Sequence, residues 1–320
     1  MDRQGSVATL RRAVAEVARA HLPDEGRWCV ALSGGGDSLA LTAVAAGLRP
    51  TTALIVDHGL QAESPHVAAI AREHALSMGC VDAQVLSVEV GSAGGPESAA
   101  RVARYAVLDA ARDGAPVLLA HTLDDQAETV LLGLGRGSGA RSIAGMRSWD
   151  PPWCRPLLGV RRTLTHAACA ELGVTPWQDP HNVDPRFTRV RLRAEVLPLL
   201  EDVLGGGVAE ALARTAAALR EDTDTLDDQA AHASAVVAAE DGPATARLAE
   251  LPAAVRRRVI RAWLLTSGAS DLTDVQIRGV DRLITDWRGQ GGVAVGSPLR
   301  HERLFAGRRG GVLITYREQV

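Results

Sequence analysis

A short loop that reads S-G-G-G-D-S, at Ser33–Ser38, follows the apolar run Trp28–Leu32 and precedes the apolar, helix-periodic segment Leu39–Leu48. Many α/β proteins bind phosphate at a strand, glycine turn and helix in this order. The free backbone N–H groups at the helix start attract anions, and glycines let the main chain come close. A Walker loop would need a lysine, which the chain lacks, and the Rossmann G-x-G-x-x-G spacing is also missing. We call this segment the phosphate loop; a simple tight turn is the alternative.

The residue types in the phosphate loop favour a nucleotide that is bound with a metal ion. Asp37 is a carboxylate, which would repel phosphate unless a cation lay between them. The serine hydroxyls and the glycine backbone can donate hydrogen bonds to phosphate. The candidate nucleotide-binding residues here are Ser33, Gly34, Gly35, Gly36, Asp37 and Ser38, with Asp37 also a candidate metal ligand.

Short apolar segments alternate with helical patterns over the first two-thirds of the chain. Repeated βα alternation predicts a parallel sheet that is covered on both faces. Ligands of such sheets gather at the carboxyl ends of the strands, where the phosphate loop, Asp57 with His58, and the segment from His121 fall. The expected strands and helices are Val30–Leu32, Thr52–Val56, Gln84–Val90 and Val117–Ala120, and Leu39–Leu48, Pro65–Met78 and Glu97–Arg112.

The sequence changes in character after Asp150, where prolines become frequent, and Gly205-Gly206-Gly207 is typical of a hinge or a helix end. We therefore predict two domains, as expected for this length. Residues 1–205 would form an α/β domain that binds the nucleotide, and residues 206–320 a smaller, mainly helical domain that ends in short strands. Its expected helices and strands are Ala209–Ala239, Leu251–Leu265 and Val275–Trp287, then Gly291–Val295, Arg303–Ala306 and Gly311–Tyr316.

Composition excludes several classes of protein. The net charge of −3 does not indicate a general polyanion binder, so nucleic acid would have to bind through local arginine clusters. The cysteines Cys29, Cys80, Cys154 and Cys169 form no C-x-x-C pair, which argues against an iron–sulfur site, a zinc ribbon or a disulfide framework.

The N-terminal segment is amphipathic rather than a signal peptide, and no apolar stretch reaches the roughly 18 residues that span a bilayer. We expect a cytoplasmic protein with no membrane partner, and a homodimer is compatible with the sequence.

A second group of polar residues begins at His121. Positions i, i+3, i+4 and i+7 of a helix share one face, so Asp124, Asp125 and Glu128 would lie with His121 at the sheet edge. We call these three carboxylates the acidic stripe. They repel one another unless they bind a cation, either Mg²⁺ or an ammonium group, and Asp125 is the second candidate metal ligand. Zinc is disfavoured because Asp125 stands where H-x-x-x-H would place a histidine. The alternative is an acidic first turn that complements the helix dipole.

Arginines near these motifs have two interpretations. Arg101 and Arg104 share one predicted helix with Glu97, where an ion pair between Glu97 and Arg101 is the ordinary explanation. The functional alternative is bidentate contact with phosphate, which suits the guanidinium fork. Arg136 and Gly137 lie in a second glycine-rich turn, which either ends a helix or contacts another phosphate of the nucleotide.

Two arginine-rich segments are candidate nucleic-acid surfaces. Arg186–Arg193 holds four arginines and follows the stretch Asp179–Asn182, and Arg256–Arg261 holds four more. Contact with a phosphate backbone is one interpretation. A solvated loop in the first case and an amphipathic helix in the second are the alternatives.

The phosphate loop matches the S-G-G-x-D-S signature of the ATP pyrophosphatase (PP-loop) superfamily. Further segments resemble one branch of it, the tRNA(Ile)-lysidine synthetases, and run in order through roughly residues 30–193. They are Val56–Leu60, Glu97–Tyr105, His121–Thr129, Arg136–Gly139, and Asp179–Asn182 with the arginines that follow. Two positions depart from the pattern: Gly36 stands where the residue is usually bulkier, and His181 replaces a common serine.

The resemblance implies a two-step reaction. ATP, bound with Mg²⁺, would adenylate the C2 carbonyl oxygen of the wobble cytidine C34 of tRNA(Ile) with a CAU anticodon, and pyrophosphate would leave. Free L-lysine would then attack C2 through its side-chain amine and expel AMP. The product, lysidine, pairs with A instead of G, so decoding changes from AUG to AUA.

The resemblance also implies roles for the candidate residues. The phosphate loop would hold the departing pyrophosphate, which Asp37 would reach through Mg²⁺. Asp57 and His58 would contact the adenosine, and Arg101 or Arg104 would stabilise charge on the α-phosphate. The acidic stripe would hold Mg²⁺ or the substrate lysine.

Two other functions stay open at this point. A tRNA thiolase of the same superfamily would activate a base in the same way but deliver sulfur, for which the cysteine spacing offers neither a pair nor a cluster. A non-catalytic adenine-nucleotide-binding protein would need neither Asp37 nor the acidic stripe.

Overall fold

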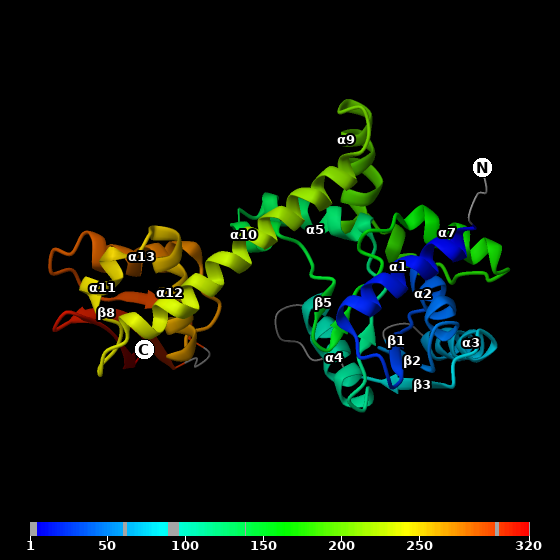
Figure 1. Ribbon diagram of the computed structural model, residues 1–320, viewed down its shortest axis with the longest axis horizontal. Coiled ribbons are helices and arrows are strands. Elements are labelled where there is room, and N and C mark those ends of the chain that lie inside the picture. Colours follow the sequence, from blue (N-terminus) through cyan, green and yellow to red (C-terminus); the bar gives the residue numbers. More distant parts are fainter. Residues whose placement is uncertain (1–4, 60–62, 89–95, 138, 298–300, 320) are drawn as a thin grey trace. The chain divides into compact units, whose positions relative to one another are not determined.

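The computed structural model of the chain describes residues 5–59, 63–88, 96–137, 139–297 and 301–319 (Figure 1). Tertiary contacts divide the chain into two units. The first comprises Met1–Leu131 and Gly145–Arg214, and the second comprises Leu132–Ala144 and Thr215–Val320. The domain boundary expected between residues 205 and 206 stays a prediction.

A six-stranded sheet forms the centre of the first unit. Its spatial order is β3-β2-β1-β4-β6-β5, and all neighbours are parallel except β5, which runs antiparallel to β6. The predicted parallel α/β fold is therefore confirmed. The strands are β1 (Trp28–Ala31), β2 (Thr51–Asp57), β3 (Asp82–Ser87), β4 (Val117–Leu118), β5 (Trp149–Asp150) and β6 (Trp153–Cys154).

Helices cover both faces of this sheet. Val30 packs in a core cluster with buried residues of α1, α2, α3 and α7, whereas its neighbours Cys29 and Ala31 pack in a second cluster with Leu108 of α4. Because both faces are buried, the central strands are continuous apolar runs. The helical elements are α1 (Ser6–His21), α2 (Gly36–Ala46), α3 (Ser64–Ser77), α4 (Pro96–Ala111), α5 (Leu123–Gly135), α7 (Arg162–Glu171), the 3-10 helix η1 (Pro180–Val183), α8 (Thr188–Arg191), the π-helix η2 (Leu192–Val196) and α9 (Leu197–Val203).

The observed elements differ from the predicted ones mainly at their ends. The helix predicted from Leu39 begins earlier, at Gly36, because the phosphate loop itself supplies the first helical turn. Strands β5 and β6 were not predicted, since each is only two residues long and Pro151-Pro152 lies between them. The predicted strand Gln84–Val90 ends, at 89–90, outside the described residues.

The second unit is mainly helical with a small antiparallel sheet of order β7-β8-β9, as predicted. Its core joins Ile260 and Leu264 of α12 to Val280, Leu304 and Leu313. Although α10 is long, neither it nor any other helix in the described ranges is apolar enough over a sufficient length to cross a bilayer. The elements are α6 (Ala140–Ile143), α10 (Val208–Val237), which begins in the first unit, α11 (Thr245–Glu250), α12 (Ala253–Thr266), α13 (Asp274–Thr285), β7 (Val293–Val295), β8 (Glu302–Arg309) and β9 (Val312–Gln319).

Three of the four arginines of α12 form ion pairs inside the second unit. Arg256 is buried, and its Nε donates to Asp281 Oδ1 at 2.6 Å. Arg257 donates to the other oxygen of Asp281 at 3.0 Å, and Arg258 Nε lies 2.8 Å from a carboxylate oxygen of Asp227. Acidic side chains of the same unit thus pair with these three arginines, as the amphipathic-helix alternative expects, and the nucleic-acid surface on this helix stays a prediction.

Candidate functional site

The phosphate loop connects β1 to α2, as its sequence predicts. Gly34 has a φ of +83°, which residues with a side chain rarely adopt, so glycine is needed at this turn. The Ser38 hydroxyl closes the loop, because it donates to Gly35 O at 2.9 Å and accepts from the Ser33 N–H at 3.2 Å. The first N–H groups of α2 have no helical partners, which makes the loop an anion site at a helix start.

Gly36, the departure from the family pattern, has a packing reason. A Cβ at this position would lie 3.2 Å from Cδ2 and Nε2 of His166 on α7 and 3.5 Å from Pro176 Cγ. The His166 ring therefore fills the space that a bulkier residue would take.

A cavity of about 250 Å³ opens at the carboxyl ends of β1 and β2, beside the phosphate loop. Pockets for whole small ligands measure about 300–1,000 Å³, so this cavity suits the nucleoside part of a nucleotide whose phosphates lie outside it. The predicted residues that line it are Ser33, Asp57, His58 and Arg104. Trp177, which was not predicted, also lines the cavity. Its backbone N–H donates to Gly34 O at 3.0 Å.

The two candidate arginines of α4 have different surroundings. Arg104 lines the cavity, and burial is the main reason that its pKa is lowered. In the described part of the chain no carboxylate forms an ion pair with Arg104. Arg101 is exposed, and its guanidinium lies 5.0 Å from the centre of the Tyr105 ring. Arg104 is half-buried, and a cation that is partly removed from water without an anion is disfavoured, so Arg104 is the better candidate to bind phosphate.

Two histidines near the strand ends favour their neutral forms. Burial lowers the pKa of His58, and Arg104 lowers it further. Burial also lowers the pKa of His121 to about 4, although Asp125 acts in the opposite direction. The Nδ1 atom of each ring is buried and has no hydrogen-bond partner among the described residues. Each ring therefore has an unused polar atom.

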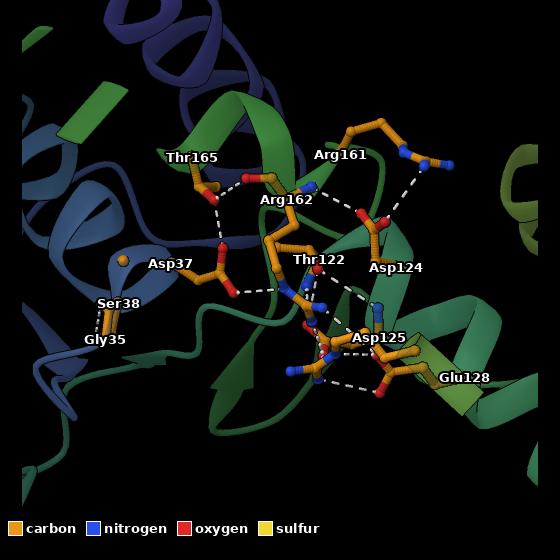
Figure 2. Close-up of polar contacts among 12 residues, drawn as sticks. Gly35, Asp37, Ser38, Thr122, Asp124, Asp125, Glu128, Arg161, Arg162 and Thr165 are labelled. Carbon is orange, nitrogen blue, oxygen red and sulfur yellow. Dashed lines mark hydrogen bonds and ion pairs between the residues drawn. The ribbon is translucent and has the colours of Figure 1, made fainter. Parts of the chain in front are cut away.

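The acidic stripe lies at the start of α5, as predicted (Figure 2). Asp125 Oδ2 accepts hydrogen bonds from the N–H and the hydroxyl of Thr122, both at 2.8 Å, so Asp125 also caps the helix. Burial raises the pKa of Asp125, but Arg162 and the bonds from Thr122 outweigh it and the pKa is lowered overall. Glu128 is fully buried and so needs a cation beside it.

That cation is Arg162, at the start of α7, which was not predicted from the sequence. Its Nε donates to Asp37 Oδ2 at 3.2 Å, its Nη2 donates to Asp125 Oδ1 at 2.5 Å, and its Nη1 lies 3.5 Å from Glu128 Oε1 (Figure 2). The hydroxyl of Thr165, one turn along α7, donates a hydrogen bond to Asp37. Burial acts to lower the pKa of Arg162, but the three carboxylates outweigh it and the pKa is raised. For Asp37, burial raises the pKa against the opposing effects of Thr165 and Arg162.

The segment Arg186–Arg193 packs against the acidic stripe instead of presenting four uncompensated charges. Arg193 Nε donates to Glu128 Oε1 at 2.8 Å, and Arg189 Nη1 lies 3.6 Å from Glu128 Oε2. The structure therefore favours local pairing over an open basic surface here. The other two arginines form ion pairs with carboxylates close by in the sequence, Arg186 with Asp184 and Arg191 with Glu195.

The residues predicted to bind a metal ion, Asp37 and Asp125, are bridged by Arg162, and each also accepts from a threonine hydroxyl. No group of three or more His, Cys, Asp or Glu side chains in the ranges given above has the arrangement of a metal site. The side chains as they stand do not form a ready-made metal site, and the assignment of these two ligands stays a prediction.

The remaining predicted nucleotide contacts, Arg136 and Gly137, follow the end of α5. Both are exposed, both fall in the second unit, and neither lines the cavity. The φ of +60° at Gly137 fits the helix-ending turn that was the alternative, and their contact with a nucleotide stays a prediction. Five positions of the resembling segments lie outside the described residues or have side chains outside them: Leu60, Glu97, Ser98, Ser138 and His181.

Two protein families match the chain. A PP-loop domain matches residues 7–200, and a TilS substrate binding domain matches residues 244–307. The first match contains the phosphate loop, the residues that line the cavity and the acidic stripe. The second lies within the second unit.

Relatives are similar over nearly the whole chain. The tRNA(Ile)-lysidine synthase of Mycobacterium bovis is 72% identical over 324 residues, which is 100% of each chain. That of Rhodococcus erythropolis is 59% identical over 311 residues, covering 97% of this chain and 95% of the relative. Among solved structures, the U34-tRNA thiolase NcsA of Methanococcus maripaludis aligns with a TM-score of 0.54 at 18% identity, covering 68% of this chain and 80% of that one, which shows a shared fold.

Proposed function

This chain belongs to the tRNA(Ile)-lysidine synthase family, and we propose that it attaches lysine to C2 of the wobble cytidine of tRNA(Ile) at the expense of ATP. One observation carries the proposal: the phosphate loop, the cavity that contains Arg104 and the acidic stripe all lie at the carboxyl ends of neighbouring parallel strands. An anion site, a cavity of nucleoside size and a group of carboxylates are what ATP and lysine require.

In the first step, the C2 oxygen of the cytidine attacks the α-phosphorus of ATP, and pyrophosphate leaves. The N–H groups at the start of α2 and the hydroxyls of Ser33 and Ser38 bind the leaving pyrophosphate. Asp57 and His58 contact the adenosine in the cavity. Arg104 stabilises the negative charge that grows on the α-phosphate, and its position in the cavity supports it over Arg101.

In the second step, the side-chain amine of lysine attacks C2 of the adenylated base, and AMP leaves. The carboxylates of Asp124, Asp125 and Glu128 attract the ammonium group of lysine. An ammonium group is not a nucleophile, so it must first give up a proton, which a carboxylate of the stripe can accept. Most of the acceleration would come from orientation and electrostatics, without a covalent intermediate on the protein.

Mg²⁺ belongs to this proposal as the companion of ATP, where it neutralises phosphate charge. In nucleotide sites it is typically held by substrate phosphates, waters and one or two carboxylates. Asp37, at the end of the phosphate loop, and Asp125 are the proposed protein ligands. Both are paired with Arg162, so no catalytic step is assigned to the ion.

The macromolecular substrate in this proposal is tRNA(Ile) with a CAU anticodon. The match to a TilS substrate binding domain at residues 244–307 supports a tRNA contact in the second unit. The proposed location is the cytoplasm, which is consistent with a tRNA substrate. The homodimer stays a prediction.

Sulfur transfer, the competing reaction, has less support. All four cysteines are buried and free. Burial raises the pKa of Cys80 to about 11 and that of Cys154 to about 12. The thiolate is the reactive form of cysteine, so these protonated thiols are poor carriers of sulfur.

The test mixes the protein with ATP, L-lysine and tRNA(Ile) transcripts that differ only at position 34, and measures the release of AMP and pyrophosphate. Lysine-dependent AMP formation with C34 but not with U34 is the expected result. AMP formation that needs a sulfur donor would instead identify a thiolase. No turnover with either transcript would identify a nucleotide-binding protein.

A further inference from the structure

Arg162 contacts carboxylates in both parts of the proposed active site. Its Nε lies 3.2 Å from Asp37, beside the phosphate loop, while its Nη2 and Nη1 lie 2.5 Å and 3.5 Å from Asp125 and Glu128 on α5. Figure 2 shows the guanidinium between the two groups. In the described residues, no other arginine forms ion pairs with both Asp37 and the acidic stripe.

Arginine side chains already compensate the negative charge of Asp125 and Glu128 in the acidic stripe. Arg162, Arg189 and Arg193 all lie within 3.6 Å of Asp125 or Glu128. A further cation, such as the ammonium group of lysine, therefore gains little attraction while all three guanidinium groups keep their places. To bind strongly, it has to replace one of them.

Arg162 is the arginine that a nucleotide can draw away. Because it also contacts Asp37, its guanidinium lies next to the loop where the phosphates are proposed to bind. Its main chain is anchored separately, since its N–H donates to Asp124 Oδ2 at 2.7 Å. The side chain can thus turn toward a phosphate while the start of α7 stays in place.

We propose that Arg162 competes with the substrate lysine for Asp125 and Glu128, and that ATP removes this competition. The phosphates at the loop attract the guanidinium, and the ammonium group of lysine then takes its place on the two carboxylates. This inference rests on the proposed function and adds a coupling between its two small substrates. ATP and lysine would bind with positive cooperativity, for which a change in affinity of about 5- to 150-fold is typical. Arg162 is in this view a positioning residue.

The test is calorimetric titration of L-lysine into the full-length protein, with and without saturating α,β-methylene-ATP and Mg²⁺. In the wild-type protein, lysine should bind at least about fivefold more tightly with the nucleotide. In Arg162→Met the competitor is gone, so lysine should bind without nucleotide about as tightly as it binds the wild type with nucleotide. Arg162→Lys keeps a charge and should retain part of the nucleotide effect. Arg191→Met is the matched control, because Arg191 pairs with Glu195 and not with the acidic stripe, and it should keep the wild-type coupling.

A purely structural role for Arg162 would give the opposite sign, with weaker lysine binding by Arg162→Met in both conditions, and that result would overturn the inference. Equal lysine affinity of the wild type with and without nucleotide would overturn it as well. Arg162→Gln, which keeps hydrogen-bond donors but has no charge, makes the same prediction if the methionine variant does not fold. If the wild type forms AMP in a lysine-dependent reaction but these variants gain no affinity, only the Arg162 inference falls. If the wild type binds no lysine in either condition, the proposed function falls with it.

Discussion

Replacing Arg104 by leucine should separate catalysis from stability. Arg104 lines the cavity, and in the described residues it has no carboxylate partner. Burial lowers its pKa, which means that the folded protein disfavours the charge. A half-buried cation without a counterion is disfavoured, and leucine removes this cost. We therefore expect the melting temperature of Arg104→Leu, followed by circular dichroism, to equal or exceed that of the wild type.

The same substitution should strongly reduce turnover. A guanidinium about 5 Å from a developing phosphate charge contributes about 3 kcal/mol at an effective dielectric constant near 20. Loss of one such donor typically costs about 10²- to 10³-fold in rate, so kcat/KM for AMP formation with tRNA(Ile) should fall by about that factor. Arg101→Leu, on the same helix but exposed, is the matched comparison and should lose at least tenfold less. Equal losses in the two variants would refute the assignment of Arg104, and so would a fall in melting temperature that accounts for the lost turnover.

Three further outcomes follow from the contacts of other residues. Asp37→Asn should abolish pyrophosphate release while changing the free energy of unfolding by no more than about 1 kcal/mol, because it keeps the shape of a partly exposed side chain; unchanged turnover would contradict a role in the reaction. Asp281→Ala leaves the buried Arg256 without its carboxylate and should cost about 3–5 kcal/mol in urea unfolding, whereas a loss below about 1 kcal/mol would show that water replaces the pair. The pKa of His121 is about 4 when folded and near its usual 6.5 when unfolded. As the pH falls from 6.5 to 4, His121 therefore binds a proton in the unfolded chain but stays neutral in the folded protein. The free energy of unfolding should fall by up to about 3 kcal/mol. His121→Gln should lack this part of the pH dependence, and identical pH profiles would count against it.

The sheet and the phosphate loop could be predicted because their signals are local in the sequence. The apolar run before Ser33, the glycines and the apolar helix after Ser38 follow one another directly. The signal for each element therefore lies within its own residues. The acidic stripe is local in the same way, since Asp125 and Glu128 need only the periodicity of one helix.

The partners of these carboxylates could not be predicted because they come from distant parts of the chain. Arg162 stands 125 positions after Asp37, and Arg193 stands 65 positions after Glu128. An arginine and a threonine three positions apart, as in Arg162 and Thr165, are too common on helices to indicate a site. For the same reason the ion pairs of Arg256 and Arg257 on α12 could not be predicted, since their common partner, Asp281, lies on α13.

The most direct measurement is the mass of nucleotide 34 after the purified wild-type protein has acted on a tRNA(Ile) transcript with a CAU anticodon, ATP and L-lysine. We predict that C34 gains one lysine less one water, and that it gains nothing without ATP or in a U34 transcript. An unmodified C34 after ATP has been converted to AMP, or sulfur in place of lysine, would contradict the proposed function.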